Sequence, residues 1–270
     1  MPELPEIYNL AKQMDLELRG QTIRGVEVVQ EKCLNMSVDQ FTKLVVGRQI
    51  ESVTSRGKWV FARLSDGAWL LLSLGMGGDA LLHRDSESLP GKYQARLDLD
   101  GGRVLTVGFW WFGYLHAAMD GDLCNHKMTA KLGPTPIRDT DFTEARFLEM
   151  LRGKRGSVKG FLLNQEQVAG IGNVYVQDTL FRARLQPNRK LESLAEGERS
   201  QLFRGLMETL IQSVRLGGLA GEKDLYGCSG RFKEFLVGYR EGQPCPECGT
   251  LVEKVKVGST ASYVCPSCQK

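Results

Sequence analysis

The sequence predicts an α+β fold in which an N-terminal helix leads into a β-sandwich, followed by a helical region and a cysteine-rich tail. Three observations support this prediction. Apolar residues recur at helical spacing over residues 3–19, short apolar runs separated by turn signals fill residues 21–118, and helical spacing returns over residues 142–216. The chain has 270 residues, of which 42% are hydrophobic and 25% charged, so it can bury a sizeable core.

The first predicted element is an amphipathic helix over residues 3–19. Its apolar positions recur every three or four residues: Leu4, Ile7, Ala11, Met14 and Leu18. Pro5 is tolerated in the first turn, where a backbone N–H has no partner within the helix. Gly20 is the predicted end of the helix.

The next segment is predicted to form strands, beginning around Ile23, Val26 and Val28. Two hairpins are indicated: residues 57–64 and 68–74 around Asp66-Gly67, and residues 93–99 and 103–107 around Asp100-Gly101-Gly102. Short strands at this spacing are typical of a sandwich. We therefore expect a sandwich domain at residues 1–119, a linker at 120–141, a helical domain at 142–227 and a tail at 228–270.

The tail carries two C-x2-C pairs separated by 16 residues: Cys245, Cys248, Cys265 and Cys268. Two such pairs supply four thiolates to one tetrahedral zinc ion, and their spacing fits known zinc sites. A redox pair is the alternative, but two matched pairs disfavour it. With four protein ligands no coordination position stays open, so one structural zinc is expected to fold the tail.

Other features of the composition narrow the class of protein. Seven cysteines, an odd number, argue against a disulfide framework. No apolar run is long enough for a membrane span, and the N-terminus does not resemble a signal peptide, so a cytoplasmic location is expected. The net charge is +3, with the basic excess in residues 142–270. That excess suits phosphate binding, although scattered solvated charges would look the same.

Pro2 is a candidate nucleophile. Removal of Met1 would expose a secondary amine, which can attack a sugar aldehyde carbon, and Glu3 would stand beside it for proton transfer. The alternative is an ordinary helix start, where acidic residues favour the positive end of the helix dipole. Spacing alone favours this alternative.

Several segments, in this order, resemble the formamidopyrimidine-DNA glycosylase and endonuclease VIII family. They are MPELPE at residues 1–6, Arg56-Gly57-Lys58, Leu74-Gly75-Met76-Gly77-Gly78, Leu132-Gly133-Pro134, residues 168–175, Gln186-Pro187 and the terminal zinc hairpin. The resemblance covers nearly the whole chain. It implies a helix–two-turns–helix motif in the helical domain, and a monomeric DNA-repair glycosylase with AP-lyase activity that acts on damaged DNA.

The resemblance also implies roles for single residues. Pro2 would attack C1′ of the damaged nucleotide to form a Schiff base, Glu3 would protonate the opening sugar ring, and Glu6 would hold the N-terminus. Lys58 would contact phosphate and assist catalysis. The implied DNA-binding residues are Met76, Trp110, Trp111, Phe112, Lys159, Gly172 and Asn173, with Met76 filling the gap left by a flipped nucleotide.

Some positions depart from the family pattern. Where an Arg-Arg-Phe-Gly run is expected, this chain has Trp110-Trp111-Phe112-Gly113, and Thr260 lies near an expected arginine of the zinc hairpin. The two tryptophans offer stacking surface for DNA, or else they pack in the core, where strand alternation would bury at least one.

These departures predict a substrate shifted away from 8-oxoguanine and leave open a non-catalytic protein that binds lesions or AP sites. A zinc-ribbon RNA-binding or regulatory protein would leave the N-terminal residues unexplained.

Overall fold

The computed structural model describes residues 1–86 and 89–270, which form two compact units. The first unit comprises Met1–Lys131 and Leu216–Phe232, and the second comprises Leu132–Arg215 and Lys233–Lys270. Residues 216–227, which the sequence analysis assigned to the helical domain, therefore cluster with the first unit.

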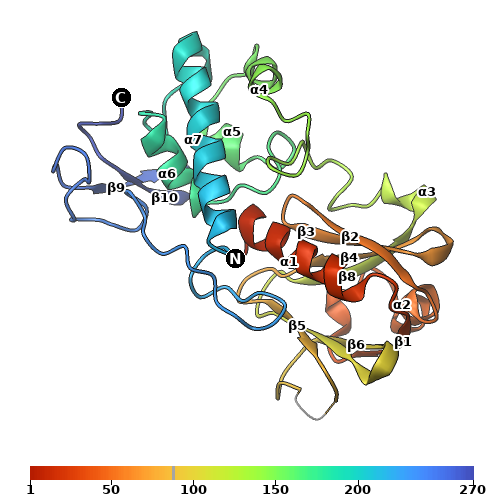
Figure 1. Cartoon of the computed structure of the whole chain (residues 1–270). Coiled ribbons are helices and arrows are strands. Elements are labelled where there is room, and N and C mark those ends of the chain that lie inside the picture. The colour runs from red at the N-terminus through yellow and green to blue at the C-terminus, as the bar shows by residue number, and fades with distance from the viewer. Residues whose placement is uncertain (87–88) are drawn as a thin grey trace. The chain divides into compact units, whose positions relative to one another are not determined.

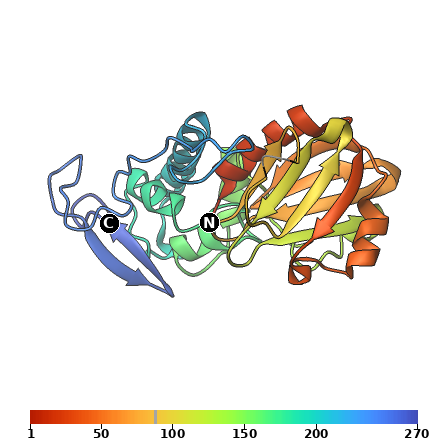
Figure 2. The ribbon, with the colours of Figure 1, turned by 90° about the horizontal axis from the view of Figure 1, so that it is seen from below.

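The first unit is a β-sandwich, as predicted (Figure 1, Figure 2). One antiparallel sheet has the strand order β1-β6-β7-β5 and the other the order β2-β3-β4-β8. The elements are α1 (Leu4–Leu18), β1 (Ile23–Val28), α2 (Val38–Val45), β2 (Ile50–Arg56), β3 (Trp59–Leu64), β4 (Ala68–Ser73), β5 (Asp79–His83), β6 (Ala95–Leu99), β7 (Val104–Gly108), β8 (Tyr114–Met119) and α3 (Asp120–Leu123).

Local sequence signals explain most of this unit. Asp66 and Gly67 adopt positive φ angles of 56° and 68° in the turn between β3 and β4, which confirms the first predicted hairpin. The second predicted hairpin joins β6 to β7. The apolar face of α1 is buried in the core of the sandwich, and Gly20 follows the helix with a φ of 83°.

Helix α2 lies within the region that the sequence predicted as strands. Ser37 caps it by accepting a hydrogen bond from the backbone N–H of Gln40, whose side chain bonds back to Ser37. Phe41 and Val45 are four residues apart and bury one face of the helix. This capping box explains why a helix forms there. The predicted linker at 120–141 also contains one short helix, α3.

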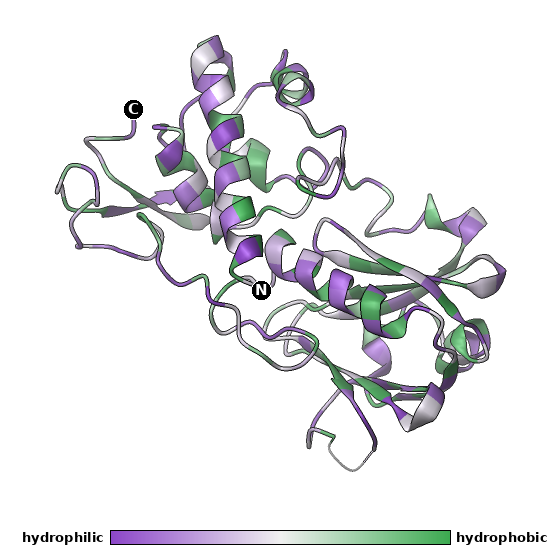
Figure 3. Cartoon of the chain, viewed as in Figure 1, coloured by the Kyte–Doolittle hydropathy of each residue, from purple (hydrophilic) through white to green (hydrophobic). Residues whose placement is uncertain are grey.

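The second unit contains four α-helices and a two-stranded hairpin among the described residues (Figure 1). They are α4 (Glu144–Leu151), α5 (Val158–Leu163), α6 (Tyr175–Arg182), α7 (Glu196–Arg215), β9 (Glu253–Val257) and β10 (Thr260–Val264). Helix α7 carries polar as well as apolar residues (Figure 3), and its buried positions include Leu202, Leu206 and Leu210. Across residues 1–86 and 89–270, no helix is both long and apolar enough to cross a membrane.

Candidate functional site

The start of α1 is buried and fixed by the carboxylate of Glu6. Pro2 is buried, and Glu3 and Glu6 are only 3% and 8% exposed. One Glu6 oxygen accepts a hydrogen bond from the Glu3 N–H at 2.7 Å, and the other accepts one from the Leu219 N–H at 2.8 Å. Glu6 thus joins the N-terminus to the loop after α7, within the first unit.

Gly218 is required beside Glu6. It has a φ of 94°, and a Cβ there would lie 2.8 Å from a Glu6 oxygen. The close approach of this loop to the N-terminus therefore depends on a residue without a side chain.

Met1, unlike the buried residues that follow it, is partly exposed to solvent. It is 46% exposed, and its amine lies 3.2 Å from a Glu222 carboxylate oxygen. While Met1 is present, the nitrogen of Pro2 belongs to a peptide bond, so its lone pair is delocalised into the carbonyl. Nucleophilic chemistry at Pro2 therefore requires removal of Met1.

Lys58 lies at the tip of the β2–β3 hairpin. Arg56 pairs with Trp59, so Gly57 and Lys58 form a two-residue turn, with Gly57 at a φ of 59°. A positive φ at the first central position is typical of a type II′ turn, for which glycine is favoured. The rigid hairpin holds the half-buried Lys58 at its end.

Met76, Trp110, Trp111 and Phe112 form an exposed cluster, here called the aromatic tip. Their exposed fractions are 45%, 81%, 66% and 66%. The Met76 N–H donates to the Trp111 carbonyl oxygen at 2.7 Å, and the Trp110 N–H donates to the Met76 carbonyl oxygen at 3.0 Å. These bonds join the loop after β4 to the loop after β7.

The expectation that at least one of the two tryptophans is buried is wrong. Trp110 and Trp111 follow β7 in a loop, so strand alternation does not apply to them. Phe109 is the buried aromatic residue here, at 6% exposure, and a Cβ on Gly113 would lie 2.1 Å from its ring. Phe109 therefore anchors the loop and the following aromatic residues face solvent.

In the second unit, Gln165 organises the two turns between α5 and α6. Its amide nitrogen donates to the carbonyls of Leu163 at 3.0 Å and Ile171 at 2.8 Å, and its amide oxygen accepts from the Gly170 N–H at 2.9 Å. Gln165 could not be predicted from the sequence, because no local pattern distinguishes a glutamine that bonds to backbone groups two to six residues away. Gln165 thereby fixes the course of both turns.

These turns lead to Gly172 and Asn173, of which Gly172 is buried and Asn173 is half-buried. The Gln177 amide nitrogen donates to the Asn173 backbone oxygen at 2.9 Å and to its side-chain oxygen at 3.1 Å. Gln177 thereby fixes the orientation of the Asn173 amide.

Lys159 is a buried cation with only 1% of its surface exposed. Its ammonium donates to the Thr260 hydroxyl at 2.8 Å, the Ala261 carbonyl at 2.8 Å and the Ser262 hydroxyl at 2.7 Å. Burial lowers the pKa of Lys159 to about 8. The structure thus directs this predicted DNA-binding lysine into the β9–β10 hairpin.

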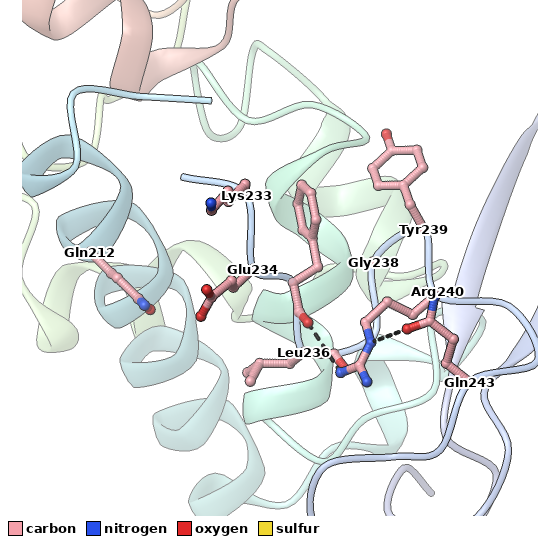
Figure 4. A pocket seen from close by; sticks show the side chains of 9 residues that line it. Gln212, Lys233, Glu234, Leu236, Gly238, Tyr239, Arg240 and Gln243 are labelled. Atoms are coloured by element: carbon pink, nitrogen blue, oxygen red, sulfur yellow. Dashed lines mark hydrogen bonds between the residues drawn. The ribbon is translucent and has the colours of Figure 1, made fainter. Parts of the chain in front are cut away.

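Asp178 holds the segment that precedes the hairpin. Its buried carboxylate accepts the backbone N–H groups of Leu236, Val237 and Gly238 at 2.8, 3.0 and 3.0 Å. This segment borders a pocket of about 690 Å³ in which Arg240 bonds to the Gln243 side chain (Figure 4). None of the residues predicted for the site lines this pocket.

The four cysteines of the tail form the predicted metal centre. Their sulfur atoms all lie within 4.8 Å of one another, with Cys248 to Cys265 at 3.4 Å and Cys245 to Cys268 at 3.9 Å. A zinc–sulfur bond of about 2.3 Å places tetrahedral sulfurs roughly 3.8 Å apart, so the cluster fits one zinc ion. Because all four ligands come from the chain, the zinc is structural.

Three family models match the chain in order. Residues 1–108 match the formamidopyrimidine-DNA glycosylase N-terminal domain, residues 132–223 the H2TH domain of the same enzymes, and residues 242–270 the zinc finger found in FPG and IleRS. A sandwich, a helix–two-turns–helix region and a zinc finger in this order define a class of DNA-repair proteins.

Whole-chain relatives identify the family. The chain is 34% identical to the formamidopyrimidine-DNA glycosylases of Chloroflexus aurantiacus and Roseiflexus sp., covering 100% of this chain and 98% and 100% of those proteins. It matches Lactococcus lactis Fpg bound to N7-benzyl-Fapy-dG DNA with a TM-score of 0.90 and 27% identity, each chain covered at 100%. A complex of that protein with abasic-site DNA gives 0.89 and 26%, each chain covered at 99%. The chain belongs to the formamidopyrimidine-DNA glycosylase family.

Proposed function

We propose that this chain is a base-excision-repair enzyme whose AP-lyase activity uses the amine of Pro2 and whose substrate range is shifted away from 8-oxoguanine. As a member of its family, it is a DNA glycosylase with lyase activity, and its partner is damaged DNA. The observation that carries the catalytic proposal is the buried start of α1, where Glu6 fixes the backbone of Glu3 next to Pro2.

The proposed chemistry begins after removal of Met1. The Pro2 nitrogen attacks C1′ of the damaged nucleotide, and the base leaves with the bonding electron pair and takes up the proton that the Pro2 nitrogen releases. Glu3 donates a proton to the sugar oxygen as the ring opens. The product is an iminium between Pro2 and C1′. Because the iminium acidifies the C2′ hydrogen, loss of that proton and departure of the 3′ phosphate can follow.

Binding is proposed to use both units. Lys58 contacts phosphate near the lesion, Gly172 and Asn173 grip phosphates around it, and Lys159 assists from within the second unit. Phosphate contacts of this kind fix the DNA backbone in register without reading its sequence.

The aromatic tip is proposed to fill the gap left by the extruded nucleotide. Extrusion costs a few kcal/mol, which an apolar wedge partly offsets. The high exposure of Trp110 and Trp111 supports this role, since both rings are available to stack on bases. Neither offers a guanidinium to the edge of the base left unpaired, so recognition of cytosine opposite 8-oxoguanine should be weak.

Borohydride trapping on AP-site DNA tests the nucleophile. Wild-type protein should form a covalent adduct, and Pro2→Gly should form much less while retaining DNA binding. Single-turnover rates on AP-site, oxidised-pyrimidine and 8-oxoguanine duplexes at one salt concentration test the substrate range. Trapping on no AP-site substrate would favour the alternative, a non-catalytic protein that binds lesions or AP sites.

We also propose that the protein acts as a monomer on nucleoid DNA in the cytoplasm. The bacterial origin of the relatives named above supports the location. Sedimentation of the protein with and without an AP-site duplex tests the monomer, which a stable dimer would contradict.

A further inference from the structure

The β9–β10 hairpin has a hollow on its surface and a buried positive charge, that of Lys159, beneath it. The hollow, of about 370 Å³, lies beside Thr260 and is also lined by Lys254 and Lys256 of β9. Beneath Thr260 is the ammonium of Lys159, whose three hydrogen-bond acceptors are all neutral oxygens. Lys254 is ion-paired with the Glu241 carboxylate at 3.7 Å, so the positive charge at this place comes chiefly from Lys256 at the surface and Lys159 below it.

Lys159 has no donor left for DNA in this arrangement. An ammonium carries three N–H bonds, and the three hydrogen bonds to the hairpin use all of them. Its side chain is also only 1% exposed. A direct contact with phosphate would require the ammonium to give up at least one hairpin bond.

The Thr260 hydroxyl, unlike the Lys159 ammonium, still has a proton that it can donate to DNA. Its oxygen accepts a hydrogen bond from Lys159, so its own proton remains available for donation. Within the hairpin that proton meets only the Val257 carbonyl oxygen, at 3.5 Å, which is a long contact. Thr260 is half-buried, whereas Ser262, two residues along β10, accepts from the same ammonium but is fully buried.

We propose that Thr260 and the hollow beside it bind a phosphate of the damaged DNA strand, and that Lys159 charges this site from below without touching DNA. The proposal rests on the proposed function and assigns a specific contact within it. A donor hydroxyl polarised by a buried cation replaces the arginine that the family-like sequence would place in this hairpin. Lys256, which pairs with Ala261 across the hairpin, adds long-range attraction at the rim.

The test uses the full-length, zinc-loaded chain and a duplex containing a tetrahydrofuran abasic analogue, with binding measured by fluorescence anisotropy. Thr260→Val removes the hydroxyl that meets solvent and should weaken binding about tenfold, as for a hydrogen bond to a charged group. Ser262→Ala is the matched control, since it removes another acceptor of Lys159 that DNA cannot reach. It should stay within about twofold of wild type, as should Thr260→Ser, which keeps the hydroxyl.

The salt dependence of DNA binding distinguishes an electrostatic role of Lys159 from a purely structural one. Lys159→Met should flatten the slope of log affinity against log salt by about 0.9, the value for one phosphate charge, whereas Thr260→Val should leave the slope unchanged. Zinc content and thermal unfolding verify that the variants are folded. If Lys159→Met does not fold, the comparison of Thr260→Val with Ser262→Ala still decides.

Equal binding by Thr260→Val and Ser262→Ala would overturn the inference, as would a wild-type salt slope in folded Lys159→Met. In either case Lys159 only stabilises the fold of the hairpin and does not contribute to DNA binding. Failure of wild-type protein to bind abasic DNA or to be trapped on it would instead contradict the proposed function, so the two failures can be distinguished.

Discussion

The His116–His126 pair should make the first unit sensitive to acid. The two imidazoles are buried and joined by a 2.9 Å contact between His116 Nδ1 and His126 Nε2, and His126 Nδ1 lies 2.8 Å from the Thr129 hydroxyl. A neutral pair can supply one donor and one acceptor at the shared contact. If both rings were protonated, two N–H groups and two positive charges would face each other.

The magnitude follows from the pKa of His116, which burial, and secondarily the neighbouring His126, lowers from 6.5 to about 4. Since the folded-state pKa is the lower one, the unfolded chain takes up the proton first. Stability from this group is therefore complete above about pH 6.5 and is lost as pH falls towards about 4. The difference corresponds to ~3 kcal/mol in the free energy of unfolding.

Urea unfolding at about pH 7 and about pH 4.5 measures this loss. The four tryptophans all lie in the first unit, so their fluorescence reports on that unit alone. His116→Asn keeps a hydrogen-bonding group but does not titrate, and its free energy of unfolding should fall by ~2–3 kcal/mol less than that of wild type between the two pH values.

Tyr114→Phe is the matched control. It keeps an aromatic ring against His116, where the ring centroids are 5.2 Å apart, and leaves both imidazoles in place. It should retain the wild-type pH dependence. An equal pH dependence in wild type and His116→Asn would refute the reasoning, because the buried imidazole would then contribute nothing to the acid sensitivity.

Three further predictions concern the chemistry and the metal. Intact-mass measurement should show mature protein without Met1, and any fraction that retains Met1 or carries an acetyl group should not be trapped on AP-site DNA through Pro2. Protein purified without chelator should contain one zinc per chain, and absence of zinc in the wild type would contradict the site. The Cys265→Ala variant should lose the metal and most DNA binding, while its sandwich stays folded. Replacing Trp110 and Trp111 together with arginines should steepen the salt dependence of DNA binding and raise the single-turnover rate on 8-oxoguanine opposite cytosine, whereas unchanged rates would count against the proposed specificity.

Features set by short-range signals could be predicted from the sequence. The turn at Asp66-Gly67 needs positive φ angles that these residues tolerate, and the two cysteine pairs have a spacing that only a few chemistries use. Helix α2 differs from the prediction because its capping box at Ser37 and Gln40 lies within a segment predicted to form strands.

Features set by tertiary contacts could not be predicted in this way. The burial of Lys159 depends on acceptors about a hundred residues away in the chain, and the exposure of Trp110 depends on Phe109 anchoring the loop in its place. Neither relation leaves a periodic pattern in the sequence. The same holds for Gln165, since its role depends on hydrogen bonds to backbone groups that only the folded turns bring close to it.

The loop at Leu216–Phe232 has a consequence for the order in which the chain can mature during synthesis. This loop supplies Leu225 to the sandwich core and the Leu219 N–H to Glu6, yet it is made long after residue 131. A ribosome must therefore translate through most of the second unit before the N-terminal helix can acquire all its partners. The segment that carries Pro2 is the first to leave the ribosome and among the last to be completed. A fragment of residues 1–131 alone would lack Leu216–Phe232, the part of the first unit that comes later in the chain, and no segment within the fragment could replace it.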